Sequence, residues 1–167
     1  MKNYVKVFNN FILEEDCDAL ITHLNTLKKQ NKLMLRGDGR FCAENLKEKV
    51  FLDMVEKYYE KVMMEVSNEY ACIFGFILSI YYEGVGMGPH VDSLEGEEVG
   101  ALFYLNDEYL GGELSVETPE GAFIYKPKKG DLVYFPSWFT HSVFPVQKGV
   151  RYFFTVSLLK NPPSKTG

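Results

Sequence analysis

The sequence predicts a mainly β protein of the α+β class, with helices near the N-terminus packed on one sheet of a sandwich, barrel or jelly roll. Apolar residues recur at helical spacing only in the first part of the chain, and short strand-like runs separated by turns fill the rest. With 167 residues, 15% of them aromatic, the chain has the size and composition of one globular domain. We therefore expect a single domain over 1–167, with a helical part at about 13–69 and a β core at about 71–160.

Two stretches in the first part of the chain have the periodicity of amphipathic helices. Over 13–27, apolar side chains fall three and four residues apart, and the acidic residues at 14–16 suit a helix N-terminus. The same spacing recurs over 46–66. A loop that contains Gly37 and Gly39 is expected between the two helices.

From residue 71 onward the chain has the texture of successive β-strands. The first run is long and rich in apolar and β-branched residues, and the later runs are short and end at turn residues such as Gly111-Gly112 and Lys148-Gly149. The expected strands are 71–82, 99–105, 113–117, 122–125, 131–135 and 150–159. Because no helical stretch separates these runs, they indicate a sandwich, a barrel or a jelly roll.

The charge, the apolar runs and the cysteines restrict the partners and the location. A net charge of −5 without a dense Lys/Arg cluster argues against a nucleic-acid-binding protein. No apolar run approaches the roughly 18 residues of a membrane span, and the N-terminus lacks the apolar segment of a signal peptide. Cys17, Cys42 and Cys72 are scattered, which indicates buried free thiols in a reducing compartment. We therefore expect a cytoplasmic protein without nucleic-acid or membrane partners.

Two of the three histidines lie in the strand-rich part and give the strongest chemical signal. His90 is followed at i+2 by Asp92, and residues two apart in a strand project from the same face, so both can bind one ion. His141 is the other imidazole in this part and a candidate third ligand. Two histidines and one carboxylate leave coordination positions open, as in non-haem Fe(II) oxygenases. The His-x-Asp pair alone is weak, and a turn histidine beside a solvated aspartate is the alternative interpretation.

Arg151 stands within a strongly apolar, strand-like run after His141. If two adjacent antiparallel strands carry these two residues, Arg151 lies near the metal. Its planar guanidinium suits bidentate binding of a carboxylate, and an arginine beside Val150 and Tyr152 needs an anionic partner. The alternative is a surface arginine on an edge strand, which these apolar neighbours make a poor fit.

Together, the motifs resemble those of the prolyl 4-hydroxylase-like branch of the 2-oxoglutarate/Fe(II)-dependent dioxygenases. The Y-x-x-G…H-x-D signature of that branch is matched by Tyr81-Tyr82-Glu83-Gly84…Pro89-His90-Val91-Asp92. Its Y-L-N…G-G-E segment is matched by Tyr104-Leu105-Asn106…Gly111-Gly112-Glu113-Leu114. Its closing motif is matched by Lys126-Pro127-Lys128-Lys129-Gly130-Asp131, Phe135, His141, Pro145-Val146, Gly149 and Arg151-Tyr152. With the usual first strand and helix matched at 7–17, the resemblance spans nearly the whole chain.

This resemblance implies a double-stranded β-helix, a jelly roll of about eight core strands, and a set of site residues. Carried over by position, the iron ligands are His90, Asp92 and His141. Arg151 is the implied partner of the far carboxylate of 2-oxoglutarate. Tyr81 and Tyr104 match tyrosines that help to hold this cosubstrate, and both also suit plain core packing. Thr155, on the same strand face as Arg151, is a further candidate for cosubstrate binding.

The resemblance also implies the reaction. Fe(II), 2-oxoglutarate and dioxygen hydroxylate an unactivated C–H bond of a peptidyl or free amino-acid substrate, and succinate and CO2 are released. Ascorbate is a further cofactor candidate. Three positions depart from the peptidyl-proline hydroxylases. Met87 replaces a usual tyrosine, Ser157 a frequent tryptophan, and Ile80 a usual arginine. These departures leave the iron chemistry intact and put prolyl specificity in doubt.

Two other functions stay open from the sequence. A nucleic-acid demethylase of the same superfamily typically has a second arginine six residues after the cosubstrate arginine, where this chain has Ser157. A non-catalytic jelly-roll module that binds a metal or another ligand has no need of three metal ligands and a cosubstrate arginine together. The sequence therefore favours the dioxygenase.

Overall fold

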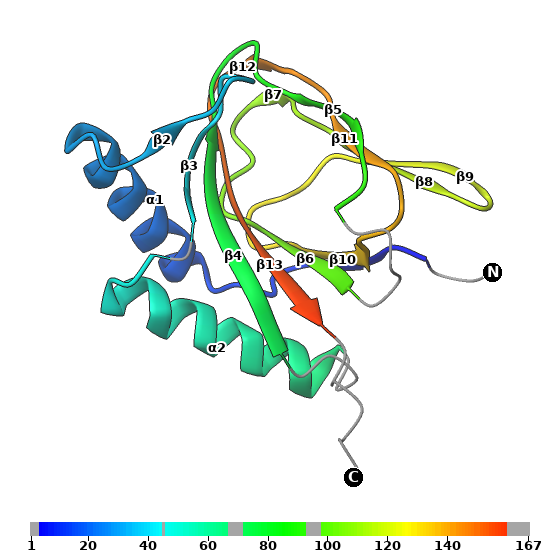
Figure 1. The fold of residues 1–167 in the computed structure, drawn as a ribbon, viewed down its shortest axis with the longest axis horizontal. Coiled ribbons are helices and arrows are strands. Elements are labelled where there is room, and N and C mark those ends of the chain that lie inside the picture. Colours follow the sequence, from blue (N-terminus) through cyan, green and yellow to red (C-terminus); the bar gives the residue numbers. More distant parts are fainter. Residues whose placement is uncertain (1–3, 45, 67–71, 93–97, 160–167) are drawn as a thin grey trace, which may run out of the picture.

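The computed structural model describes residues 4–44, 46–66, 72–92 and 98–159, with the backbone alone described at 72–75. Two helices and thirteen strands lie in these ranges (Figure 1). In chain order they are β1 (Lys6–Phe8), α1 (Glu14–Lys29), β2 (Met34–Leu35), β3 (Phe41–Glu44), α2 (Lys49–Glu65), β4 (Cys72–Tyr81), β5 (Met87–His90), β6 (Glu98–Tyr104), β7 (Leu110–Gly111), β8 (Leu114–Thr118), β9 (Gly121–Tyr125), β10 (Leu132–Pro136), β11 (His141–Val143), β12 (Val146–Lys148) and β13 (Arg151–Leu159). Both expected helices and all six expected strands are present.

The strands form two facing sheets and a short ribbon. The larger sheet has the order β1-β10-β6-β13-β4-β3-β2, the smaller sheet has the order β5-β11-β8-β9, and β12 pairs with β7. Every pairing among the described strands is antiparallel. Figure 1 shows α1 and α2 on the outer side of the larger sheet and the smaller sheet on its other side. This arrangement confirms the mainly β, double-stranded β-helix with N-terminal helices packed on one sheet.

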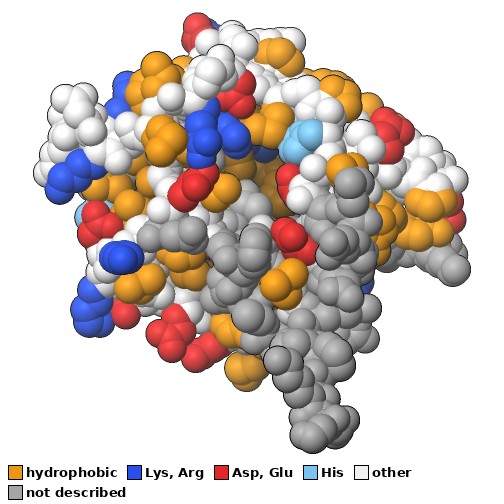
Figure 2. Space-filling model, in the orientation of Figure 1, with side chains coloured by type: hydrophobic (Ala, Val, Ile, Leu, Met, Phe, Trp, Pro, Cys, Tyr) orange, Lys and Arg blue, Asp and Glu red, His pale blue; other side chains and the backbone are white. Residues whose placement is uncertain are grey.

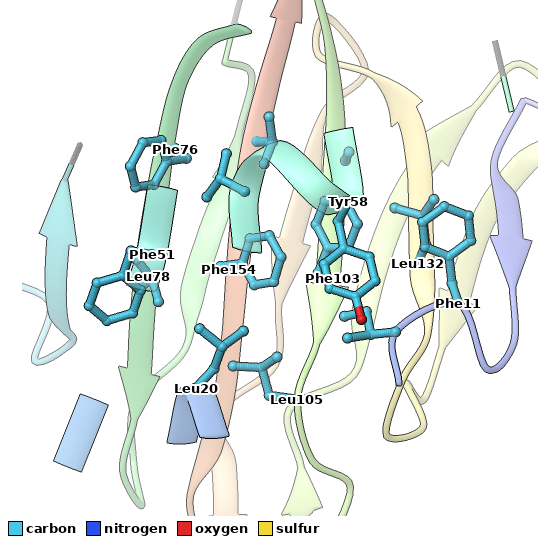
Figure 3. Close-up of a cluster of buried hydrophobic side chains, with 14 of the residues drawn as sticks. Phe11, Leu20, Phe51, Tyr58, Phe76, Leu78, Phe103, Leu105, Leu132 and Phe154 are labelled. Atoms are coloured by element: carbon cyan, nitrogen blue, oxygen red, sulfur yellow. The ribbon is translucent and has the colours of Figure 1, made fainter. Parts of the chain in front are cut away.

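The alternation of side chains along β13 builds two separate cores. Phe154 belongs to the core beneath the helices, whereas Phe153 belongs to the core between the sheets. In Figure 3, Phe154 lies beside Phe103 of the neighbouring β6, and their rings stack with centroids 4.4 Å apart. Leu20 of α1 and Tyr58 of α2 reach into the same cluster. Because residues two apart share a face, the helical core fixes which side chains of β13 face the interior between the sheets.

The expected loop with Gly37 and Gly39 is present between the helices, and two short strands that were not predicted flank it. β2 and β3 form a hairpin, and β3 pairs with β4 so that Cys42 lies opposite Ser79. Gly39 has a φ of 93°, which suits the turn of this hairpin. The sequence signal was weak because β2 has two residues and β3 has four, too few for a recognisable alternation.

Two expectations about cysteines and membranes are tested by the structure. Cys17 and Cys42 are buried and free, as predicted, and burial raises the pKa of the Cys17 thiol to about 11. The side chain of Cys72 lies outside the described part. Within the described ranges, neither helix has the length and apolar character of a membrane-crossing segment.

A buried polar network fixes α1 against α2. Asp16, in the first turn of α1, accepts hydrogen bonds from the Tyr58 hydroxyl and from Lys57 Nζ (2.7 Å). The Tyr58 oxygen in turn accepts from the Leu13 backbone N–H (3.0 Å), one of the amides left free at the start of the helix. Burial opposes ionisation of Asp16, but the hydrogen bonds from Lys57 and Tyr58 outweigh it and lower its pKa.

We predict that Asp16→Asn destabilises the protein by about 1–3 kcal/mol at neutral pH, because the variant loses charge-assisted hydrogen bonds. Since the folded-state pKa of Asp16 lies below the unfolded value of about 4, this stabilisation is present above that value and is lost as the pH falls through the folded pKa. Urea unfolding from about pH 7 to about pH 3 should therefore show a wild-type advantage that shrinks in acid.

Asp53→Asn is the matched control for this prediction, because Asp53 forms an exposed i,i+4 pair with Lys49. Exposed pairs contribute little to stability, so this variant should unfold like the wild type. A wild-type advantage over Asp16→Asn that stays constant across the pH range would contradict the assignment.

Candidate active site

The structure brings His90, Asp92 and His141 together at the end of the smaller sheet. His90 is the last residue of β5 and His141 the first residue of β11, and antiparallel pairing places them opposite each other. Their ring centroids lie 4.3 Å apart. Asp92 lies beyond the end of β5, so the expectation that it shares a strand face with His90 was wrong. Its backbone N–H donates to the Ser137 carbonyl (3.0 Å), and this contact, rather than strand alternation, holds it beside the histidines.

The possible ligand atoms of these three residues converge on one point. Asp92 Oδ1 lies 3.4 Å from His90 Nε2, and Asp92 Oδ2 lies 3.2 Å from His141 Nε2. One ligand atom from each residue fits within a span of 4.8 Å. The Nδ1 atoms of His90 and His141 each lie 2.8 Å from a backbone carbonyl oxygen, of Gly88 and Phe139 respectively. Because a carbonyl only accepts, each Nδ1 carries a hydrogen, and each Nε2 is left to face Asp92.

Asp92 is the anionic centre of this cluster. Burial would raise its pKa, but hydrogen bonds from His141 and His90 outweigh burial and hold the pKa far below the ordinary value. The hydrogen bond to Asp92 is in turn the main cause of the raised pKa of His90. The carboxylate is therefore ionised at neutral pH. Two imidazoles and an ionised carboxylate form a donor set that suits Fe(II).

A cavity of about 280 Å³ lies beside the histidines and Asp92. Figure 2 shows the hollow, bordered by a histidine and by acidic and basic side chains, with apolar side chains inside it. Met87 and Ser157, two of the three positions at which the chain departs from peptidyl-proline hydroxylases, both line this cavity. So does Arg40, whose Nε lies 3.2 Å from Asp38 Oδ2. Sequence reasoning missed Arg40 because it lies in the loop between β2 and β3 and belongs to no spacing pattern.

Arg151, the predicted cosubstrate-binding residue, is completely buried. Its guanidinium carbon lies 5.1 Å, 5.0 Å and 4.2 Å from the ring centroids of Tyr81, Tyr104 and Phe153. Nη2 donates to the Tyr104 hydroxyl (3.2 Å), whereas Nε and Nη1 are buried without a hydrogen-bond partner among the described residues. A buried, unpaired cation is costly, and the aromatic rings offset only part of that cost. The surroundings of Arg151 therefore fit an anion that the described residues do not supply.

Arg151 and His141 were expected on two adjacent antiparallel strands, and the structure places them differently. β13 belongs to the larger sheet and β11 to the smaller sheet, so Arg151 and His141 do not lie on adjacent strands. Arg151 is paired instead with Tyr81 of β4. Its neighbour Phe153 shares the core between the sheets with Phe135, whose ring packs edge-on against His141 at 4.9 Å. The two halves of the site therefore meet across the interior, from opposite sheets.

The other cosubstrate candidates lie on the same interior face. Tyr81 and Thr155 line the cavity, and Tyr104 is completely buried with its hydroxyl on Arg151. Thr155 follows Arg151 and Phe153 in the alternating series along β13 and lies opposite Leu102 of β6. Burial raises the pKa of Tyr81 and Tyr104, so both hydroxyls keep their hydrogen at neutral pH and remain donors.

Comparison with known proteins gives a family. The family model of the 2OG-Fe(II) oxygenase superfamily matches residues 76–158. A PKHD-type hydroxylase from Synechococcus sp. (strain JA-2-3B'a(2-13)) is 26% identical over 152 residues, which cover 83% of this chain and 65% of the relative. One from Acaryochloris marina is 31% identical over 128 residues, with coverage of 73% and 56%. The chain thus spans less than two thirds of the length of these relatives.

Solved structures share the fold at low sequence identity. A prolyl-4-hydroxylase from Pseudomonas putida matches with a TM-score of 0.78 and 17% identity, over 95% of this chain and 94% of that one. The epimerase SnoN from nogalamycin biosynthesis, which is alpha-ketoglutarate dependent, matches with a TM-score of 0.79 and 11% identity, over 98% and 86%. At these identities the likeness shows the double-stranded β-helix alone, and that fold serves more than one reaction.

The match to the family model includes all three metal-ligand candidates and Arg151. The superfamily implies Fe(II) and 2-oxoglutarate, and the donor set of His90, Asp92 and His141 and the unpaired guanidinium of Arg151 fit these two groups. The chain therefore belongs to the 2OG-Fe(II) oxygenase superfamily, and it is similar in sequence to PKHD-type hydroxylases and in fold to a prolyl-4-hydroxylase.

Proposed function

We propose that this chain is a hydroxylase that acts on a peptidyl or free amino-acid substrate. Its cosubstrates are 2-oxoglutarate and dioxygen, one oxygen atom enters a C–H bond of the substrate, and the other enters succinate as CO2 is released. The main support is that two features occur together between the sheets. One is the cluster of two histidines and one carboxylate, and the other is a buried arginine with two nitrogens that have no hydrogen-bond partner among the described residues. A binding module has no need of this combination.

In this proposal His90, Asp92 and His141 hold the iron, which supplies the oxidising chemistry together with 2-oxoglutarate when both are bound. Each histidine presents Nε2, because its Nδ1–H donates to a backbone carbonyl. Asp92 contributes the negative charge that its low pKa secures. The protein therefore fixes the orientation of all three ligands before the metal binds, and the metal takes the place of the protons that Nε2 of each histidine shares with Asp92.

Arg151 is the proposed anchor for the far carboxylate of 2-oxoglutarate. Nε and Nη1 are free to donate, and Tyr104 holds Nη2, so the fork is oriented by the protein. Tyr81 and Thr155 are proposed to add hydroxyl donors along the cosubstrate, since both line the cavity. The aromatic cage around the guanidinium excludes water and strengthens the charge-assisted bonds.

The proposal includes a single domain and a cytoplasmic location. We propose that residues 1–167 act as one dioxygenase domain, because the proposed ligands and Arg151 come from the two sheets that close around one core. The two buried free thiols support the expected cytoplasmic location. The net charge of −5 is the basis for expecting no nucleic-acid partner.

The first prediction from the proposed function concerns the metal. His90→Ala, Asp92→Ala and His141→Ala should each abolish or strongly weaken Fe(II) binding, because each removes one of three ligands. All three should remain folded, since none of these residues is a member of the two hydrophobic clusters and only His141 packs against one of them. Anaerobic Fe(II) titration with circular dichroism as the folding check tests both points. The exposed residue Asp53 gives a control, Asp53→Ala, and wild-type iron affinity in any ligand variant would remove that residue from the set.

The second prediction concerns the cosubstrate. Arg151→Ala should weaken 2-oxoglutarate affinity by about 30-fold or more, because breaking a buried charge pair costs on the order of 2–5 kcal/mol. Arg151→Lys should lose less, since lysine keeps the charge and forfeits the two-pronged geometry. Fe(II) binding should survive in both. Unchanged dependence of succinate formation on 2-oxoglutarate in Arg151→Ala would place the cosubstrate elsewhere.

The third prediction concerns the substrate. Succinate formation should show little stimulation by simple poly-proline peptides, because Met87 and Ser157 stand in the cavity where prolyl hydroxylases carry aromatic residues. The double variant with Met87→Tyr and Ser157→Trp tests whether these positions are responsible. Mass spectrometry of the peptides, for the gain of one oxygen atom, is the readout. Robust hydroxyproline formation by the wild type would show that these two positions do not set specificity.

A further inference from the structure

Tyr109 is a buried residue beside Arg151 to which the sequence motifs give no role. It precedes β7 and is 5% exposed. Its hydroxyl is buried and has no hydrogen-bond partner among the described residues. Burial raises its pKa, and the nearby Arg151 guanidinium acts in the opposite direction. The two groups are therefore close, but they do not meet the geometry of a hydrogen bond.

The local backbone is built to hold Tyr109 against Arg151. Gly112 has a φ of 69°, and a Cβ at this position would lie 3.0 Å from Tyr109 Cε2 and 3.1 Å from Arg151 Cδ. Gly149 has a φ of 88°, and a Cβ there would lie 3.1 Å from Tyr109 Cβ. Gly112 therefore leaves room for the Tyr109 ring to pack beside the Arg151 side chain, and Gly149 leaves room for the backbone at Glu108 and Tyr109.

Lys126 holds the same segment from the other side. Its Nζ lies 3.6 Å from the centroid of the Tyr109 ring and donates to the backbone carbonyls of Tyr109 (3.0 Å) and Gly111. These contacts restrain both the ring and the backbone of Tyr109. The unpaired hydroxyl is therefore a fixed feature of the packing, and its position does not depend on a hydrogen bond of its own.

The unpaired donors at Arg151 and Tyr109 all require a hydrogen-bond acceptor. The Tyr109 hydroxyl and the Nε and Nη1 of Arg151 are all buried donors without an acceptor among the described residues. Leaving such groups unsatisfied is costly, and folded proteins rarely do so without a functional reason. A carboxylate accepts through two oxygens, with about four lone-pair sites, and so has the capacity to satisfy all three donors at once.

We infer that Tyr109 is a further cosubstrate-binding residue, whose hydroxyl donates to the same carboxylate that Arg151 binds. The inference rests on the proposed function, because it assigns Tyr109 to the 2-oxoglutarate site. It accounts for the fixed position of the ring and the absence of an internal acceptor. The residue acts by binding and orienting the cosubstrate and takes no part in metal ligation.

Tyr109→Phe is the decisive variant, measured by calorimetric titration of 2-oxoglutarate into anaerobic Fe(II)-loaded protein. Loss of a hydrogen bond to a carboxylate should weaken the affinity by about tenfold or more. In the absence of cosubstrate, the thermal unfolding midpoint of Tyr109→Phe should equal or exceed that of the wild type. The reason is that the hydroxyl forms no hydrogen bond within the described protein and is costly to bury.

Tyr125→Phe is the matched control, because the Tyr125 hydroxyl donates to Asp131 Oδ2 (2.6 Å) and accepts from Asn9 (3.3 Å). It should show the opposite pattern, a lower unfolding midpoint with unchanged 2-oxoglutarate affinity. Wild-type affinity in Tyr109→Phe overturns the inference, and so does a loss of affinity that comes with a lower unfolding midpoint. If the wild-type protein itself fails to bind 2-oxoglutarate, the proposed function fails instead.

Discussion

A guanidinium that is buried without an anionic partner is the constraint on which the rest of the site depends. Arg151 is held at the start of β13, between Tyr81 of β4 and the Tyr104 hydroxyl of β6. Aromatic rings surround it, and Gly112 lets the chain approach its side chain closely. Such a group is tolerated in a stable fold when an anion completes it. We propose that a carboxylate, which the described residues do not provide, is the anion that completes this site.

The two-sheet fold brings this guanidinium to the same interior as the candidate metal ligands. The helices bury the outer face of the larger sheet, including Phe154, so the alternation along β13 directs Arg151 and Phe153 toward the smaller sheet. That sheet carries His90 and His141 on paired strand ends. The ligand proposed to span the two has a carboxylate at one end and metal-binding oxygens at the other, which is the description of a 2-oxo dicarboxylate.

Much of this account could be predicted from the sequence, and the errors have a common physical cause. Helices, strands and the metal-ligand candidates follow from local periodicity and motif order, which the sequence carries directly. The position of Asp92 beside Ser137, the location of Arg151 in the sheet opposite His141, and the pairing of β3 with β4 depend on contacts between residues far apart in the chain. Arg40 and Tyr109 were missed for the same reason, because neither belongs to a spacing pattern and only the folded chain places them at the cavity or beside Arg151.

The most direct test of the central claim compares two 2-oxo acids as stabilisers of the Fe(II)-loaded protein under anaerobic conditions. 2-Oxoglutarate has the far carboxylate that Arg151 is proposed to bind, whereas 2-oxovalerate has the same chain length and a methyl group in its place. A ligand that binds only the folded state raises the unfolding midpoint, and the rise grows with the logarithm of its concentration relative to its Kd. The account predicts a concentration-dependent rise with 2-oxoglutarate and a far smaller one with 2-oxovalerate. Equal stabilisation by the two acids would contradict the claim that the buried guanidinium binds a carboxylate.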